Sequence, residues 1–227
     1  GGCMKNIKII GICGGSASGK TSISKMISEK NEDMITLLSQ DSYYKSYDEL
    51  SLDQKKKINF DHPDAFDIDL LKQHLNDLKN NCIIECPIYS FNNYCREKET
   101  LRIIPNNTIL IEGMLILYYP EIRDLLDFSI YIDVNEHIRL KRMIYRDVNE
   151  RGRTVLHVLN QYERDMKPMH DRFVELQKEY ASIVINGNNS FDTVCNDVIE
   201  YIQSLDILSE ENKYKNNKLI KTLYSEK

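Results

Sequence analysis

Residues 14–21 read GGSASGKT, and this stretch decides the fold. It fits the pattern G-x-x-x-x-G-K-[ST], in which backbone N–H groups of a glycine-rich loop surround phosphate oxygens at a helix start. The apolar run KIIGIC (8–13) precedes it, and Ile23, Met26 and Ile27 follow at helical spacing. The stretch therefore predicts a nucleotide site between a strand and a helix. A plain glycine-rich turn is the alternative.

The loop also predicts which residues hold the phosphates. Lys20 is expected to reach the outer phosphates, and the Thr21 hydroxyl to supply an oxygen to Mg²⁺. No apolar run ends in the NKxD segment that reads guanine. The expected nucleotide contacts are Gly14, Gly15, Ser16, Ala17, Ser18, Gly19, Lys20, Thr21 and Ser22.

The fold class follows from four further runs that resemble KIIGIC: ITLLSQD (35–41), TILIEG (108–113), FSIYIDV (128–134) and ASIVING (181–187). Short runs rich in Ile, Val and Leu are typical of parallel strands buried on both faces. Helical patterns separate several of them. We therefore predict an α/β fold of the P-loop NTPase type, a five-stranded parallel sheet flanked by helices. Within residues 42–107, CIIECPIYSF and ETLRII predict an inserted β-hairpin.

Two carboxylates follow predicted strands, at the edge where parallel sheets bind ligands. Asp41 can accept a proton from an attacking hydroxyl or hold the hydration shell of Mg²⁺, whereas capping a turn is the alternative. Glu112 fits the acidic partner of Mg²⁺ beside the loop, and a solvated charge at a strand end is its alternative.

The arginine-rich segment RMIYRDVNERGR (142–153) is a third candidate element. Phosphoryl transfer spreads negative charge over the transferred oxygens, and arginines on a lid can close over them. Gly152 would give the segment a hinge. A charged, solvated helix end is the alternative.

Composition excludes several classes of protein. The chain has 227 residues and a net charge of −5, which argues against a nucleic-acid surface. No apolar run approaches the roughly 20 residues of a membrane-spanning helix, and the start shows no signal-peptide pattern. The six cysteines form no CxxC pair, so reduced thiols in the cytoplasm are expected. A metal site on Cys82 and Cys86 has little support.

The chain resembles the uridine–cytidine kinase family from about residue 7 to about residue 203. The resemblance is carried by GGSASGKTS, LSQDSYY, NFDHPDAFD, PIYSF, ILIEGMLILYYPEIRDLLD, RDVNERGR, QYERDMKPMH and YASIVI, in this order. It implies ATP-dependent phosphorylation of the 5′-hydroxyl of uridine or cytidine with Mg²⁺. It also implies an arginine lid and commonly a homotetramer. On this basis we expect one kinase domain over 1–206, with a nucleoside-binding insertion (42–107) and a lid region (142–165), then a polar tail (207–227).

The resemblance also implies roles for individual residues. Asp41 matches the catalytic base, and Asp61 the residue that binds the ribose hydroxyls. Arg146 and Arg151 match catalytic lid arginines that face the phosphates. The remaining matches belong to the nucleoside site: Phe60, Tyr89, Phe91, Arg153 and Gln161.

Two departures from the family pattern concern the nucleoside. Where the family reads P-x-Y-D-F-x-x-H-x-R, this chain reads PIYSFNNYCR (87–96), so Ser90 and Tyr94 replace Asp and His. Because a Tyr oxygen can accept from the cytosine amine, we hypothesise that Tyr94 favours cytidine. Met143 stands where the family often has Arg. Alternatives are a kinase of another small molecule, such as pantothenate, and a regulator that binds nucleotide without catalysis.

Overall fold

The computed structural model describes residues 6–205. The strands are β1 (Lys8–Gly14), β2 (Ile35–Ser39), β3 (Ile84–Ser90), β4 (Cys95–Ile103), β5 (Thr108–Gly113), β6 (Phe128–Asp133) and β7 (Ile183–Asn186). The α-helices are α1 (Lys20–Lys30), α2 (Leu52–Lys55), α3 (Ile68–Lys79), α4 (Pro120–Arg123), α5 (Glu136–Arg151), α6 (Val155–Gln161), α7 (Lys167–Met169) and α8 (Phe191–Ser204). Short 3₁₀ and π turns connect them: Gln40–Tyr43, Pro63–Ala65, Tyr162–Met166, His170–Val174 and Glu175–Tyr180.

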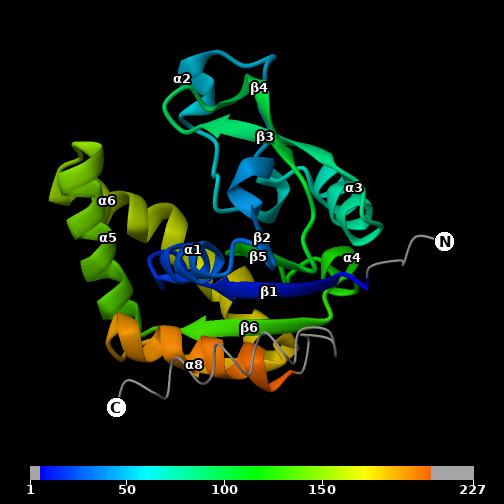
Figure 1. Cartoon of the computed structure of the whole chain (residues 1–227). Coiled ribbons are helices and arrows are strands. Elements are labelled where there is room, and N and C mark those ends of the chain that lie inside the picture. The colour runs from blue at the N-terminus through cyan, green and yellow to red at the C-terminus, as the bar shows by residue number, and fades with distance from the viewer. Residues whose placement is uncertain (1–5, 206–227) are drawn as a thin grey trace.

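The main sheet has five strands in the order β2-β5-β1-β6-β7, and all of its neighbouring strands are parallel (Figure 1). The predicted α/β class and five-stranded parallel sheet are therefore confirmed. Strand β1 lies in the middle, so the glycine loop leaves from the centre of the sheet. Since every strand runs the same way, all carboxyl ends meet at one edge, where the expected acids lie.

Residues of β1 alternate between two hydrophobic cores, as strand geometry requires. Ile10 and Ile12 pack toward the face covered by α1 and α8, where Ile23 and Val194 are buried. The other face is covered by α3 and by the segments around residues 115–122 and 173–174. Burial on both faces explains why the five strands read as nearly continuous apolar runs.

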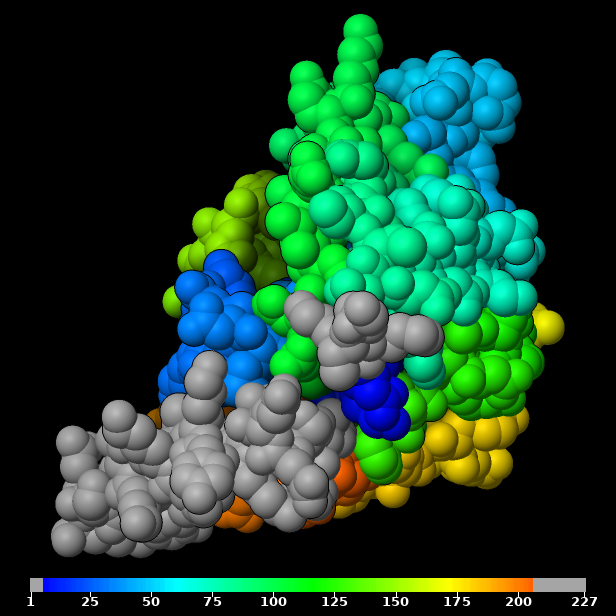
Figure 2. Space-filling model, turned by 45° about the vertical axis from the view of Figure 1, so that its right-hand side comes forward, coloured from blue at the N-terminus to red at the C-terminus, as the bar shows by residue number. Residues whose placement is uncertain are grey.

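The predicted hairpin is formed by β3 and β4, which pair antiparallel with an irregularity between Pro87 and Tyr89. It lies outside the main sheet, near α2 and α3 (Figure 1). In the space-filling view the hairpin projects from the top of the molecule (Figure 2). Arg96 attaches it to the body, because its guanidinium donates to the Tyr44 carbonyl at 3.1 Å and to Asp67 at 3.1 Å.

Two predicted boundaries differ from the structure. The run 35–41 ends as a strand at Ser39, because the Ser39 Oγ accepts from the Asp41 N–H and starts a 3₁₀ turn. The run 181–187 forms a strand only over Ile183–Asn186. No helix among residues 6–205 is both long and apolar enough to cross a membrane. The predicted polar tail (207–227) lies outside the described residues.

Candidate active site

The glycine loop connects β1 to α1 in a tight turn. The Ser18 N–H donates to the Gly15 carbonyl at 3.1 Å, and Gly19 has a φ of 93° just before α1 begins at Lys20. A Cβ on Gly15 would come within 2.8 Å of the His170 ring and 2.9 Å of the Arg139 guanidinium. Glycine is therefore required at 19 by backbone conformation and at 15 by space.

Polar groups of the loop are arranged to receive an anion. The loop ends at the N-terminus of an 11-residue helix, whose first N–H groups point out of the helix. The Lys20 ammonium lies over the loop and donates to the Gly15 carbonyl at 3.3 Å. Among the described residues, the buried Ser18 Oγ has no hydrogen-bond partner. This combination fits a polyphosphate, as the motif predicts.

Glu112 joins the loop to the carboxyl edge of the sheet. It is buried, with 2% of its surface exposed, and accepts hydrogen bonds from Thr21 Oγ1 at 3.0 Å and from the Ser39 hydroxyl. It is therefore not the solvated strand-end charge that was the alternative. Hydroxyl and carboxylate oxygens are hard ligands, and Mg²⁺ uses one or two of them with phosphates and waters. The donor set thus fits Mg²⁺.

Asp41 lies in the 3₁₀ turn after β2, with its side chain half-buried. The turn is capped by Ser39, which contradicts the alternative that Asp41 is there as a cap. Burial and, to a smaller extent, the nearby Glu112 carboxylate raise the pKa of Asp41 to about 6. The positive charges of Lys20, Arg151 and Arg146 oppose the shift. A carboxylate with this pKa is suited to accept a proton near neutral pH.

Asp61 lies in the segment before the 3₁₀ turn Pro63–Ala65, and its N–H donates to the Asn59 side chain at 3.1 Å. Burial raises the pKa of Asp61 to about 6, and the negative charges of Asp165 and Asp41 add to the shift. The opposing charge is again that of Lys20. The two acids and this lysine are thus close enough to act on one another electrostatically.

Aromatic side chains from the insertion gather beside these acids. Tyr44 is central: its ring centroid lies 5.7 Å from Phe60, 5.2 Å from Tyr89 and 6.2 Å from Phe91. The Phe91 side chain is 56% exposed, which is unlike a core residue. The Tyr89 hydroxyl is buried, and no described residue is its hydrogen-bond partner. The cluster therefore offers flat apolar surfaces and one free polar atom to a ligand.

Tyr94 belongs to the same cluster. Its ring centroid lies 5.5 Å from that of Phe60, and its φ of 53° is left-handed, at the end of the turn between β3 and β4. Ser90, the other replaced residue of the hairpin pattern, accepts the Asn93 N–H in that turn at 3.3 Å. Tyr94 therefore extends the aromatic surface, whereas Ser90 shapes the turn.

The arginine-rich segment forms the C-terminal half of α5, which Gly152 ends with a φ of 63°. Arg146, Arg151 and Arg153 all contact the buried carboxylate of Asp147, so the segment is not simply a solvated helix end. Arg153 also donates to Gln161 at 3.0 Å, which brings together two residues of the expected nucleoside side.

Met143, the second departure from the family pattern, is buried in a small core under this segment. It packs with Val158 and Tyr162, which belong to α6 and to the turn after it. The methionine therefore stabilises the packing of α5 on the following helix, where an arginine would need a charged partner.

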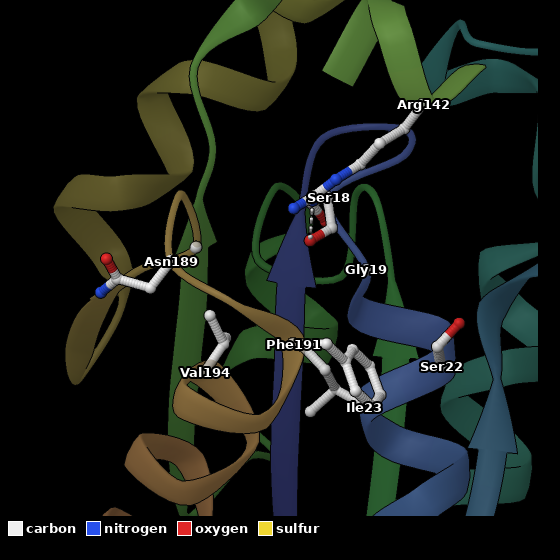
Figure 3. A pocket seen from close by; sticks show the side chains of 9 residues that line it. Ser18, Gly19, Ser22, Ile23, Arg142, Asn189, Phe191 and Val194 are labelled. Carbon is white, nitrogen blue, oxygen red and sulfur yellow. Dashed lines mark hydrogen bonds between the residues drawn. The ribbon is translucent and has the colours of Figure 1, made fainter. Parts of the chain in front are cut away.

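A cavity of about 420 Å³ lies beside the start of α1 (Figure 3). Phe191, Ile23 and Val194 form its apolar wall. Arg142 reaches over it from α5 and donates to the Ser18 carbonyl at 3.4 Å, the contact drawn in Figure 3. Asn189 lies on the opposite side. The cavity adjoins the glycine loop and has room for a flat ring system.

Sequence reasoning missed several of these residues. Tyr44 is the last residue of the segment LSQDSYY (38–44), which also carries Asp41, but it was given no role. The two adjacent tyrosines after a candidate base were an available signal. Arg142 lies within the arginine-rich segment but had no assigned partner. Phe191 and Asn189 carry no local signal, because the strand and helix pattern around them is ordinary.

Comparisons with known proteins show the family to which the chain belongs. The profile of the family described as phosphoribulokinase / uridine kinase matches residues 9–194. The uridine kinase of Clostridium botulinum (strain Okra / Type B1) is 45% identical over 189 residues, covering 82% of this chain and 92% of that protein. The uridine kinase of Macrococcus caseolyticus (strain JCSC5402) is 41% identical over 203 residues, covering 89% and 98%.

A solved structure with a similar fold is a putative fructose transport system kinase from Silicibacter sp. TM1040. Its TM-score is 0.65 at 15% identity, and the match covers 82% of this chain and 92% of that one. At this identity the similarity concerns the fold alone.

Proposed function

Because the chain belongs to the phosphoribulokinase / uridine kinase family, we propose that it transfers the γ-phosphoryl group of ATP to the 5′-hydroxyl of uridine, cytidine or both, giving UMP or CMP. One observation carries the proposal. Two acids of raised pKa, Asp41 and Asp61, lie within electrostatic reach of the loop lysine and beside an aromatic cluster. Donor and acceptor sites thus meet at one edge of the sheet.

The residues account for each part of the transfer. Asp41 accepts the proton of the 5′-hydroxyl as its oxygen attacks the γ-phosphorus, and ADP leaves with the electrons of the broken P–O bond. Lys20, Arg146 and Arg151 provide positive charge where negative charge develops. With these groups in place around the phosphates, less reorganisation is needed in the transition state.

The donor ATP is held by the loop and the adjoining cavity. Its phosphates lie on residues 14–22, and its adenine enters the cavity between the apolar wall and Arg142. A flat ring fits against Phe191, and an arginine plane can stack on the other side. A magnesium ion would be held by Thr21 and Glu112, and it would neutralise phosphate charge.

The acceptor nucleoside binds in the insertion (42–107). The carboxylate of Asp61 accepts from the ribose hydroxyls, and the base lies against Tyr89, Phe91 and Phe60. The lid region (142–165) closes over this site with Arg153 and Gln161. A homotetramer in the cytoplasm, the expectation from sequence, belongs to the same proposal.

An acceptor panel tests the function. The purified chain is incubated with ATP, Mg²⁺ and one acceptor at a time: uridine, cytidine, adenosine or pantothenate. We expect UMP or CMP by phosphorus NMR and chromatography, and no product from Lys20→Ala. Transfer only to pantothenate would replace the proposal with another small-molecule kinase. Nucleotide binding without any transfer would support the regulator.

A further inference from the structure

Asp147, near the C-terminal end of α5, has 3% of its surface exposed. Its Oδ1 accepts from Arg146 Nε at 2.8 Å and lies 3.4 Å from Arg151 Nη1. Its Oδ2 accepts from Arg153 Nη1 at 3.0 Å. The N–H groups of Gly152 and Arg153 both donate to its backbone carbonyl. One buried residue therefore holds the whole turn that carries these arginines.

The charges of this cluster do not cancel. Three guanidinium groups surround one carboxylate, which leaves two positive charges in excess. Burial and the neighbouring charge of Arg146 lower the pKa of Arg151, as crowding of like charges predicts. Without the carboxylate, the three cations would repel one another and separate. The excess positive charge is complementary to the negative charge of a transferred phosphoryl group.

The three arginines serve two sides of the site. The charges of Arg146 and Arg151 act on Asp41 and lower its pKa, against the effect of burial. Arg153 instead donates to Gln161 at the end of α6. The Asp147 carboxylate is the contact common to both groups.

We propose that Asp147 is a positioning residue of the transfer reaction, whose carboxylate presets two lid arginines toward the phosphoryl group and Arg153 toward the nucleoside. In this proposal Asp147 does not touch the reacting atoms and acts through the three guanidinium groups that it binds. The inference rests on the kinase function proposed above.

The first test is Asp147→Asn, which keeps the shape and removes the charge. We expect kcat to fall about 100-fold, because displacing transition-state groups by about 1 Å costs that much. The affinity for uridine or cytidine, measured by calorimetry without ATP, should weaken about tenfold through Arg153. KM for ATP should stay within about threefold, since the arginines keep their charge.

Glu136→Gln is the matched control. It removes a carboxylate from the same helix, where Glu136 accepts from Tyr162 and Lys167 and has no arginine partner among the described residues. We expect its kcat and nucleoside affinity to remain within about twofold of the wild type. A loss equal to that of Asp147→Asn would mean that any charge removed from α5 has this effect, and would overturn the inference.

A double-mutant cycle separates positioning from folding. If Asp147 acts through Arg151, then Asp147→Asn should cost less than about tenfold in kcat when Arg151→Gln is already present. If the fold-losses in kcat of the two single variants multiply in the double variant, the two residues act independently and the inference is overturned. If Asp147→Asn does not fold, Asp147→Glu takes its place in the cycle. Asp147→Glu keeps the carboxylate but moves it by the length of one methylene group. We expect this variant to have an about tenfold lower kcat and a nearly unchanged melting temperature.

The outcomes distinguish the two proposals. A wild type that phosphorylates no pyrimidine nucleoside would overturn the function. If the wild type does phosphorylate one, and a folded Asp147→Asn variant has the same kcat and the same nucleoside affinity, only the role of Asp147 is overturned.

Discussion

At the residue scale, the site of Asp41 disfavours the ionised form of its carboxyl group. The pKa of about 6 exceeds the ordinary value of 3.8, so the folded protein binds this proton more tightly than the unfolded chain does. Stability contributed by the protonated acid is complete below pH 3.8 and is lost as the pH rises through about 6. The ionised form needed for catalysis therefore destabilises the fold at neutral pH.

Asp41→Asn should lower kcat by about 10²–10⁴-fold, because the proton of the 5′-hydroxyl loses its acceptor. The same variant should melt at a higher temperature than the wild type at pH 7.5, and the difference should vanish near pH 4. Calorimetric melting and initial rates measure the two effects. In the wild type, kcat/KM should fall about tenfold per pH unit below pH 6. An unchanged kcat would exclude Asp41 as the base.

Tyr94 is the residue on which the choice of base depends. Its ring lies against Phe60 in the aromatic cluster, and its hydroxyl can accept from the cytosine amine. We expect the wild type to have the higher kcat/KM for cytidine, and Tyr94→His to shift the ratio toward uridine by about tenfold. Tyr145→His, at an exposed position of α5, should leave the ratio unchanged. Equal use of both nucleosides by the wild type would contradict this hypothesis.

At the element scale, the hairpin β3–β4 is held to the body by apolar packing at its base and by polar contacts of Arg96. Ile84, Cys86 and Ile103 are buried in the main core. The Arg96 backbone N–H donates to Ser46, and its guanidinium donates to the carbonyls of Tyr43 and Tyr44 and to Asp67. Tyr89 pairs with Arg96 toward the other end of the hairpin, where Tyr94 also lies, so Arg96 helps to position the nucleoside surface.

Arg96→Ala should therefore raise KM for the nucleoside by about 10–100-fold, since the hairpin aromatics would lose their position. KM for ATP should stay within about twofold, because the loop and the cavity beside α1 belong to other elements. Arg102→Ala on the same strand is the control, since Arg102 is exposed. Steady-state kinetics with each substrate varied in turn measure the two KM values separately. An equal rise of both KM values would indicate a general loss of fold.

At the scale of the whole molecule, the site is assembled from three parts of the chain. The loop and the edge acids come from the main sheet, the aromatic cluster from the insertion, and the arginines from α5. The contact between Glu112 and Thr21 holds the first part together, and the contact between Arg96 and the Tyr44 carbonyl fixes the hairpin to the segment after β2. Binding of both substrates should therefore stabilise the molecule more than either one alone.

The quaternary state is the remaining property of the whole molecule. Resemblance to the family predicts a homotetramer, so light scattering should give about four times the 26.6 kDa of one chain. Dilution over a hundredfold range tests whether the assembly is stable. A mass of one chain at all concentrations would contradict the expectation and leave the site, which lies within one chain, unaffected.

The sequence by itself determined the glycine loop and the parallel sheet. Both depend on contiguous residues: the loop needs GGSASGKT in order, and strands buried on both faces must be apolar throughout. Asp41 and Glu112 were found for the same reason, because each directly follows or ends such a run. Tyr89, Phe91 and Tyr94 came only from resemblance, since alternation along a strand fits a core equally well.

Only the tertiary structure decided which of these residues meet. Glu112 is buried against Thr21, 91 positions away, and Phe191 joins Ile23 beside the loop. Asp147 reads locally as one more charge on a helix, yet burial makes it the common partner of three arginines. Such contacts depend on the path and register of the whole chain, because burial and distance are properties of the packed molecule and not of any stretch of its sequence.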